Sequence, residues 1–167
     1  MSNRPRQSDA RHPEISLSPN QVTIETGGST RSIRRKGREL ALQALYQIEI
    51  TGDTSAGAVD LFLSHFEGNA RAKDFARELV SGVVSQRVEI DRRIAQCTEN
   101  WKLGRLAKVD LVLLRMATYE LIFCPDIPAN VSLDEAIEIA KRFGTGDSPA
   151  FINGVLDQVA RASGLID

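Results

Sequence analysis

Apolar side chains recur every three or four residues through most of this chain, and no segment shows the sustained alternation of a β-strand. One helix face is defined by four residues at positions i, i+3, i+4 and i+7: Ala41, Ala44, Leu45 and Ile48. The same spacing recurs along the chain as far as Gly164. We therefore predict an all-α fold of about seven helices.

The most apolar segment, residues 106–123, is long and rich in Leu, Met, Ala and Glu, which favours a buried helix over a strand. Pro125 and Pro128 are expected to end it. The sequence Ser132-Leu133-Asp134-Glu135 is typical of a capping box and predicts that the next helix starts there. Residues 75–97 are expected to form one long helix or two, because Gly82 weakens the pattern.

The formal net charge of −1 conceals two opposite parts. Residues 1–38 carry a net charge of +5, and residues 39–167 carry −6. Residues 1–32 are polar and poor in apolar side chains, so we expect a flexible basic tail ahead of one helical domain at residues 33–164. A basic end on an acidic body is typical of a protein that meets a polyanion at that end.

Several classes of protein do not fit this sequence. Two cysteines fit no zinc or disulfide framework and suggest a reducing compartment, and no apolar stretch reaches about 18 residues. The N-terminus lacks the features of a secretory signal, which leaves a cytoplasmic location with no membrane partner. His12 and His65 stand alone, and no catalytic or phosphate-loop motif is present, so we expect no catalytic residue, metal or cofactor.

Four cations crowd the start of the first predicted helix: Arg34, Arg35, Lys36 and Arg38. The helix dipole disfavours cations at this end, so an external anion is a reasonable compensation. Arginine grips phosphates in a bidentate manner, which favours an RNA-binding arm. A solvated, frayed helix end is the alternative.

A second candidate site lies in residues 144–154, where a helix starting at Pro149 would present N–H groups to an anion. Phe151 could stack on a base, and Asn153 could hydrogen-bond a base edge. The alternative is ordinary packing, with Phe151 in the core, Asn153 in solvent and Gly154 at a close contact.

Four motifs, in one order, resemble the NusB family. They are RRKGRELALQALY at residues 34–46, VDLVLLRMATYEL at 109–121, IPANVSLDEAIEIAKRFG at 127–144 and DSPAFINGVLD at 147–157. The resemblance covers about residues 33–162 and leaves only the tail outside. Several long motifs in register are far more specific than any one of them.

The resemblance implies two packed three-helix-like subdomains and a non-catalytic role in transcription antitermination in bacteria. Such a protein binds boxA RNA of ribosomal RNA operons with the ribosomal protein NusE, and assembles with RNA polymerase, NusA and NusG. The family's RNA contacts match Arg34, Arg35, Lys36, Arg38, Gln43, Phe151, Asn153 and Gly154 of this chain.

The surface for NusE is less visible in the sequence. Tyr46 and Asp110 are the candidates, since tyrosine tolerates half-burial at interfaces. Both could instead be intramolecular, with Tyr46 in the core and Asp110 capping a helix or forming a salt bridge.

Two departures from the family pattern concern the predicted site. Gly37 interrupts the basic motif and is expected to delay the helix start, and Pro149-Ala150 replaces polar or basic residues of the loop.

Two other functions compete with this non-catalytic role in antitermination. A NusB-like domain also precedes the catalytic domain of some ribosomal RNA cytosine methyltransferases, and a homodimer could use the basic arm to meet an acidic partner.

Overall fold

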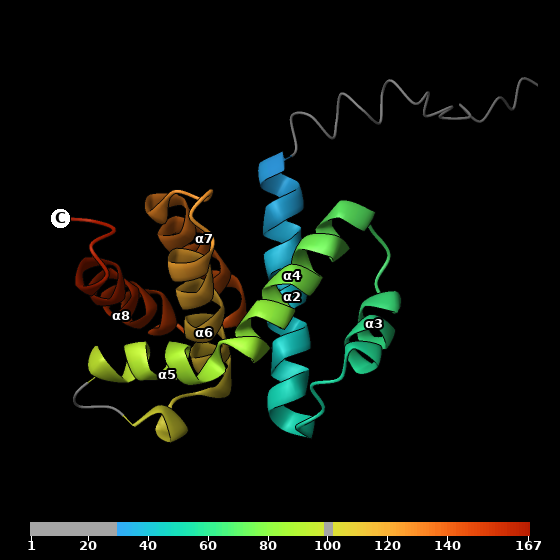
Figure 1. Cartoon of the computed structure of the whole chain (residues 1–167), viewed down its shortest axis with the longest axis horizontal. Coiled ribbons are helices and arrows are strands. Elements are labelled where there is room, and N and C mark those ends of the chain that lie inside the picture. Colours follow the sequence, from blue (N-terminus) through green and yellow to red (C-terminus); the bar gives the residue numbers. More distant parts are fainter. Residues whose placement is uncertain (1–29, 99–101) are drawn as a thin grey trace, which may run out of the picture. The chain divides into compact units, whose positions relative to one another are not determined.

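The computed structural model of the chain describes residues 30–98 and 102–167, and the fold below is that of the unit formed by residues 32–167. Its elements are α2 (Thr30–Thr51), α3 (Ala56–Ser64), α4 (Ala70–Ser85), α5 (Arg87–Gln96), the 3-10 turn η1 (Leu103–Arg105), α6 (Lys108–Phe123), α7 (Ala129–Phe143) and α8 (Ser148–Ala162) (Figure 1). No strand occurs among the described residues, so the all-α prediction is confirmed. The predicted tail lies almost wholly outside them, and its flexibility stays a prediction.

The helices form two groups. One contains α2, α3 and α4, and the other contains α6, α7 and α8, which pack on one another (Figure 1). Both α4 and α5 also pack against α6 and join the groups. The predicted stripe at residues 75–97 is thus divided between two helices, with the break after Ser85 rather than at Gly82.

Helix α6 is the centre of the core, as its apolar sequence predicts. All residues from 111 to 118 are buried. The one charged side chain among them, Arg115, is neutralised on two sides: its guanidinium lies 2.8 Å from Glu49 of α2 and 2.8 Å from Asp91 of α5. A buried cation needs such partners, and here they tie three helices together.

Gly37 does not delay the start of α2, which begins at Thr30 and runs through it without a break. A Cβ atom at Gly37 would lie 2.8 Å from Cδ1 of Phe75 and 2.9 Å from the carbonyl oxygen of Ala72. The absence of a side chain at Gly37 therefore allows α2 and α4 to approach closely. The predicted delay of the helix start is wrong, because the packing of α2 against α4 outweighs the low helix propensity of glycine.

The predicted capping box at residues 132–135 is also wrong. Helix α7 starts at Ala129, with Pro128 ahead of it, so Ser132 already lies inside the helix. The Ser132 hydroxyl donates a hydrogen bond to Glu120 of α6 at 2.8 Å. Glu135 is buried and accepts from Arg35 of α2. Both side chains serve contacts between helices, which a local sequence pattern does not reveal.

Candidate nucleic-acid interface

A stripe of four residues on one side of α2 reaches the surface, and it is interrupted at residues 37–42, all of which are buried. Lys36 is exposed, Gln43 is half-buried, and Tyr46 and Ile50 are 39% and 55% exposed. These positions lie on one side of a helix because their spacings are close to whole turns. The stripe changes from basic at its N-terminal end to aromatic and aliphatic at its C-terminal end.

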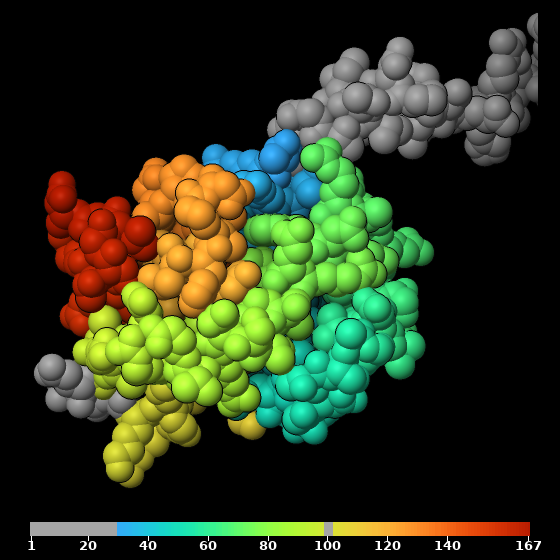
Figure 2. Space-filling model, in the orientation of Figure 1, coloured from blue at the N-terminus to red at the C-terminus, as the bar shows by residue number. Residues whose placement is uncertain are grey.

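The N-terminal end of α2 (blue) reaches the surface between α7 (orange) and α4 (green) in Figure 2. The Arg34 guanidinium lies over the ring of Phe75, 5.7 Å from its centroid, and 3.6 Å from the carboxylate of Asp126. Arg35 donates two hydrogen bonds to the Glu135 carboxylate, at 2.8 and 3.0 Å. Both arginine side chains are 38% exposed, so they are oriented by the protein and still reach solvent.

Arg38 differs from its neighbours because it is buried, and this location contradicts the prediction that it contacts RNA. Its guanidinium is buried and makes three hydrogen bonds with the Glu120 carboxylate, the shortest at 2.6 Å. It also lies 5.4 Å from the centre of the Phe75 ring. A phosphate cannot reach it without opening the interface between α2 and α6. Arg38 is a structural residue beneath the basic surface.

Two cations that sequence reasoning missed lie beside Arg35. Lys141 and Arg142, in the last turn of α7, line a shallow cavity of about 280 Å³ together with Arg35 and Glu39. Arg142 donates to Glu39 at 2.7 Å, yet its side chain is 65% exposed, and that of Lys141 is 58% exposed. Cations are common in the last turn of a helix, so their sequence position gave no signal of a binding role.

The second predicted element is the start of α8, which follows α7 after a short connection and packs on it. Phe151 is half-buried against the core, whereas Asn153 and Gly154 are exposed. Phe151 therefore combines the two alternatives, since it packs against the core and is only partly buried. The Ser148 hydroxyl accepts a hydrogen bond from the Thr145 N–H at 2.9 Å and closes the connection.

The C-terminal half of the α2 stripe borders a groove of about 300 Å³. The groove is lined by Leu42, Gln43, Tyr46, Gln47, Phe62, Val109 and Phe143. Tyr46 therefore lies outside the core. Gln43, expected at RNA, and Tyr46, expected at the partner, share this one groove.

Asp110 follows Val109 in the first turn of α6. Its Oδ1 atom is buried and accepts no hydrogen bond from the described residues, and no ion pair reaches it from that part of the chain. The cap or salt bridge weighed for Asp110 is thus absent within residues 30–98 and 102–167. Such an atom is costly to leave without a donor.

The remaining candidates from the sequence are two histidines and two cysteines. His65 is exposed, with Nδ1 2.8 Å from the carbonyl oxygen of Leu61, and His12 lies outside the described residues. Cys97 and Cys124 are unbridged and half-buried, and burial raises the pKa of the Cys124 thiol to about 11. Across the described ranges no group of potential metal ligands occurs, and none of their helices is long and apolar enough to cross a bilayer.

Comparison with known proteins agrees with this architecture. The model of the NusB family matches residues 35–161. The transcription antitermination protein NusB of Geobacter sulfurreducens is 54% identical over 128 residues, covering 76% of this chain and 93% of that protein.

Solved structures have the same fold. Thermotoga maritima NusB superposes with a TM-score of 0.69 at 41% identity, covering 77% of this chain and 90% of that one. A NusB chain solved with NusE and double-stranded RNA superposes with a TM-score of 0.72 at 24% identity, covering 78% and 98%. With the family model matching most of the chain and a relative identical at more than half of the aligned positions, this chain belongs to the NusB family of transcription antitermination proteins.

Proposed function

We propose that this chain is a non-catalytic adaptor that binds boxA RNA of ribosomal RNA operons together with NusE. In this role it supports assembly of an antitermination complex on RNA polymerase with NusA and NusG, in the cytoplasm. The observation that carries the proposal is the change from basic to aromatic residues along the side of α2 that reaches the surface, from exposed Lys36 through half-buried Gln43 to exposed Tyr46. RNA takes the basic half, and the protein partner takes the apolar half.

Electrostatics favour RNA at the basic half. Arg34, Arg35 and Lys36 lie in the second turn of α2, and Lys141 and Arg142 stand beside Arg35. Arg34 and Arg35 are already oriented by Phe75 and Glu135, so little side-chain entropy remains to be lost when a phosphate binds. Each cation that contacts single-stranded RNA contributes about −0.7 to the slope of log affinity against log salt.

Base recognition is assigned to the start of α8. The accessible part of Phe151 offers a stacking surface, and Asn153 offers an amide to a base edge. Gly154 adds an open position, because a Cβ atom there would meet nothing within 4 Å. RNA can therefore approach the helix closely at this point.

The apolar half of the stripe suits a protein partner. The groove beside Tyr46 is mainly apolar, and the buried Oδ1 of Asp110 lacks a donor among the described residues. A partner that buries the groove and donates a hydrogen bond to Asp110 would remove that cost. The solved complex of a NusB with NusE and RNA, which has the same fold, supports NusE as that partner.

The test is a titration of fluorescently labelled boxA RNA with and without NusE, followed by anisotropy. We expect NusE to tighten RNA binding, and Tyr46→Ala to reduce this synergy while leaving NusE-free binding unchanged. An Arg34→Ala/Lys36→Ala variant should weaken RNA binding in both cases. Arg92→Ala, an exposed arginine on α5, is the matched control.

Light scattering of the same samples separates this role from self-association. A dimer whose mass does not change when boxA RNA is added would contradict the proposal. So would RNA binding that responds neither to NusE nor to the arginine and lysine substitutions.

A further inference from the structure

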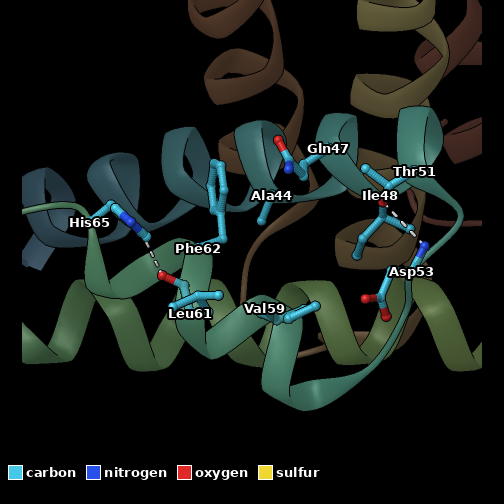
Figure 3. A pocket seen from close by; sticks show the side chains of 10 residues that line it. Ala44, Gln47, Ile48, Thr51, Asp53, Val59, Leu61, Phe62 and His65 are labelled. Carbon is cyan, nitrogen blue, oxygen red and sulfur yellow. Dashed lines mark hydrogen bonds between the residues drawn. The ribbon is translucent and has the colours of Figure 1, made fainter.

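A second groove lies between α2 and α3, and none of its lining residues was predicted to contact RNA or a partner. It has a volume of about 240 Å³, and its lining includes Ile48, Thr51, Asp53, Val59, Leu61 and Phe62. Figure 3 shows the Phe62 ring rising from α3 toward α2 on one side and Asp53 on the other. Leu61 at its rim is 64% exposed, although it is a large aliphatic side chain.

This groove is continuous with the one beside Tyr46. Both are lined by Gln47 and Phe62, so the two grooves adjoin at these residues, and together they are called the trough. The ring of Phe66 packs against that of Phe62 at a centroid distance of 5.1 Å and supports it. A segment lying in the trough would cross Phe62 and place an apolar side chain on each side of it.

The segment that forms the groove between α2 and α3 carries charges of one sign. Residues 39–70 contain five carboxylates and neither lysine nor arginine. Three of these carboxylates form ion pairs with arginines from other helices: Glu39 with Arg142, Glu49 with Arg115 and Asp60 with Arg77. The others are Asp53 and Glu67.

Asp53 lines the trough, and within the described residues it forms no ion pair. Its Oδ1 accepts a hydrogen bond from the Ser55 N–H at 3.0 Å, which fixes the carboxylate at that end of the trough. An apolar groove with a carboxylate in its lining is complementary to an apolar segment that carries a cation.

We propose that the partner seated at Tyr46 extends across Phe62 into the groove between α2 and α3, with an apolar side chain against Leu61 and a lysine or arginine at Asp53. This inference rests on the proposed function, since it extends the surface assigned there to NusE. The segment is defined by its chemistry: apolar residues flanked by a cation.

Other occupants fit less well. RNA would bring its phosphates to Asp53, where no lysine or arginine lines the groove. In a two-fold contact between two copies, the acidic segment 39–70 of one copy would face the same segment of the other. Like charges in such a contact oppose association.

The test compares NusE affinity of the full chain and of four variants by isothermal titration calorimetry at two salt concentrations. Leu61→Ser removes the exposed aliphatic side chain, and Asp53→Asn removes the charge while keeping an oxygen that can accept from Ser55. We expect about tenfold weaker binding for Leu61→Ser. For Asp53→Asn we expect weaker binding that also depends less on salt. Val88→Ser, at an 87% exposed position on α5, is the matched control, and Tyr46→Ala tests the first groove.

The outcomes separate the two proposals. If Tyr46→Ala weakens NusE binding but Leu61→Ser and Asp53→Asn bind as the unmodified chain does, the extension is wrong and the proposed function stands. If none of the three variants weakens it, the partner assignment itself fails. Weaker RNA binding by Leu61→Ser without NusE, or loss of a dimer in that variant, would assign the trough to RNA or to a second copy and overturn the extension.

Discussion

Nη2 of Arg38 lies 2.6 Å from Oε1 of Glu120, and the two side chains are only 3% and 2% exposed. Ser132 of α7 donates to the same carboxylate, so one buried cluster connects α2, α6 and α7. Arg34, Arg35 and Lys36, which form the basic surface, directly precede this part of α2 in the sequence. The cluster therefore holds the end of α2 on which RNA binding is proposed.

Removing one partner of this pair should destabilise the whole protein. Arg38→Met would leave the Glu120 carboxylate buried without its cation, and breaking such a pair costs about 3–5 kcal/mol. The free energy of unfolding in urea, followed by circular dichroism, measures the effect. Arg34→Met is the control, because its partly exposed ion pair contributes at most about 1 kcal/mol. Equal stability of the two variants would contradict the assignment of Arg38 as structural.

The basic motif shows which features of the candidate site can be predicted from the sequence and which cannot. A run of four cations at a helix start indicates an anion site, but it does not distinguish Arg38, which faces inward, from Lys36, which faces solvent. That distinction depends on where α6 crosses α2, and therefore on tertiary packing. Lys141 and Arg142 were missed for the same reason, since only the fold brings α7 beside Arg35.

We expect Gly37→Ala to destabilise the protein, although alanine has a higher helix propensity than glycine. Alanine in a helix interior is better than glycine by about 1 kcal/mol, but a Cβ atom here would lie 2.8 Å from Phe75 and 2.9 Å from the Ala72 carbonyl oxygen. Overpacking of this kind costs about 1–3 kcal/mol, so we expect Gly37→Ala to lower the melting temperature. Gly57→Ala in α3 is the matched control, because a Cβ atom there meets nothing within 4 Å, and it should be neutral or stabilising. An increase in melting temperature for Gly37→Ala would show that α2 and α4 are not held in close contact.

Helix positions were predicted well where the local pattern and the packing agree. Residues 108–123 form a largely buried helix because most of their side chains are apolar, and the prolines at 125 and 128 separate it from α7. The capping box predicted at Ser132 and Glu135 is wrong because their spacing matches a cap, whereas their hydrogen-bond partners come from α6 and α2. Asp110 was identified only through the family resemblance, since a lone carboxylate in a first helical turn ordinarily signals a favourable dipole contact.

Cys124 should make stability decrease in alkaline solution. Burial raises the pKa of its thiol to about 11 from an ordinary value of 9.0, with Glu120 and Asp126 adding to the effect. Between these values the unfolded chain binds fewer protons than the folded one, so the free energy of unfolding falls as pH rises from about 9 to about 11. Below pH 9 the stabilisation is fully present. Chemical denaturation at several pH values should show a smaller decrease in the free energy of unfolding for Cys124→Ala. If this free energy falls equally with pH in both proteins, Cys124 is not the cause of the decrease.

Lys141 and Arg142 should contribute to RNA affinity through phosphates rather than bases. Replacing both with glutamine removes two cations beside Arg35 and keeps groups that can hydrogen-bond, including one able to donate to Glu39. Because each contact to single-stranded RNA contributes about −0.7 to the salt slope, the slope should flatten by about 1.4. Binding should weaken equally for boxA and for an unrelated RNA, since phosphates carry no sequence information. Arg161→Gln, an exposed arginine paired with Asp157 in the last turn of α8, is the matched control and should leave the slope unchanged. A double variant that loses discrimination between the two RNAs, with an unchanged slope, would instead assign these residues to base recognition.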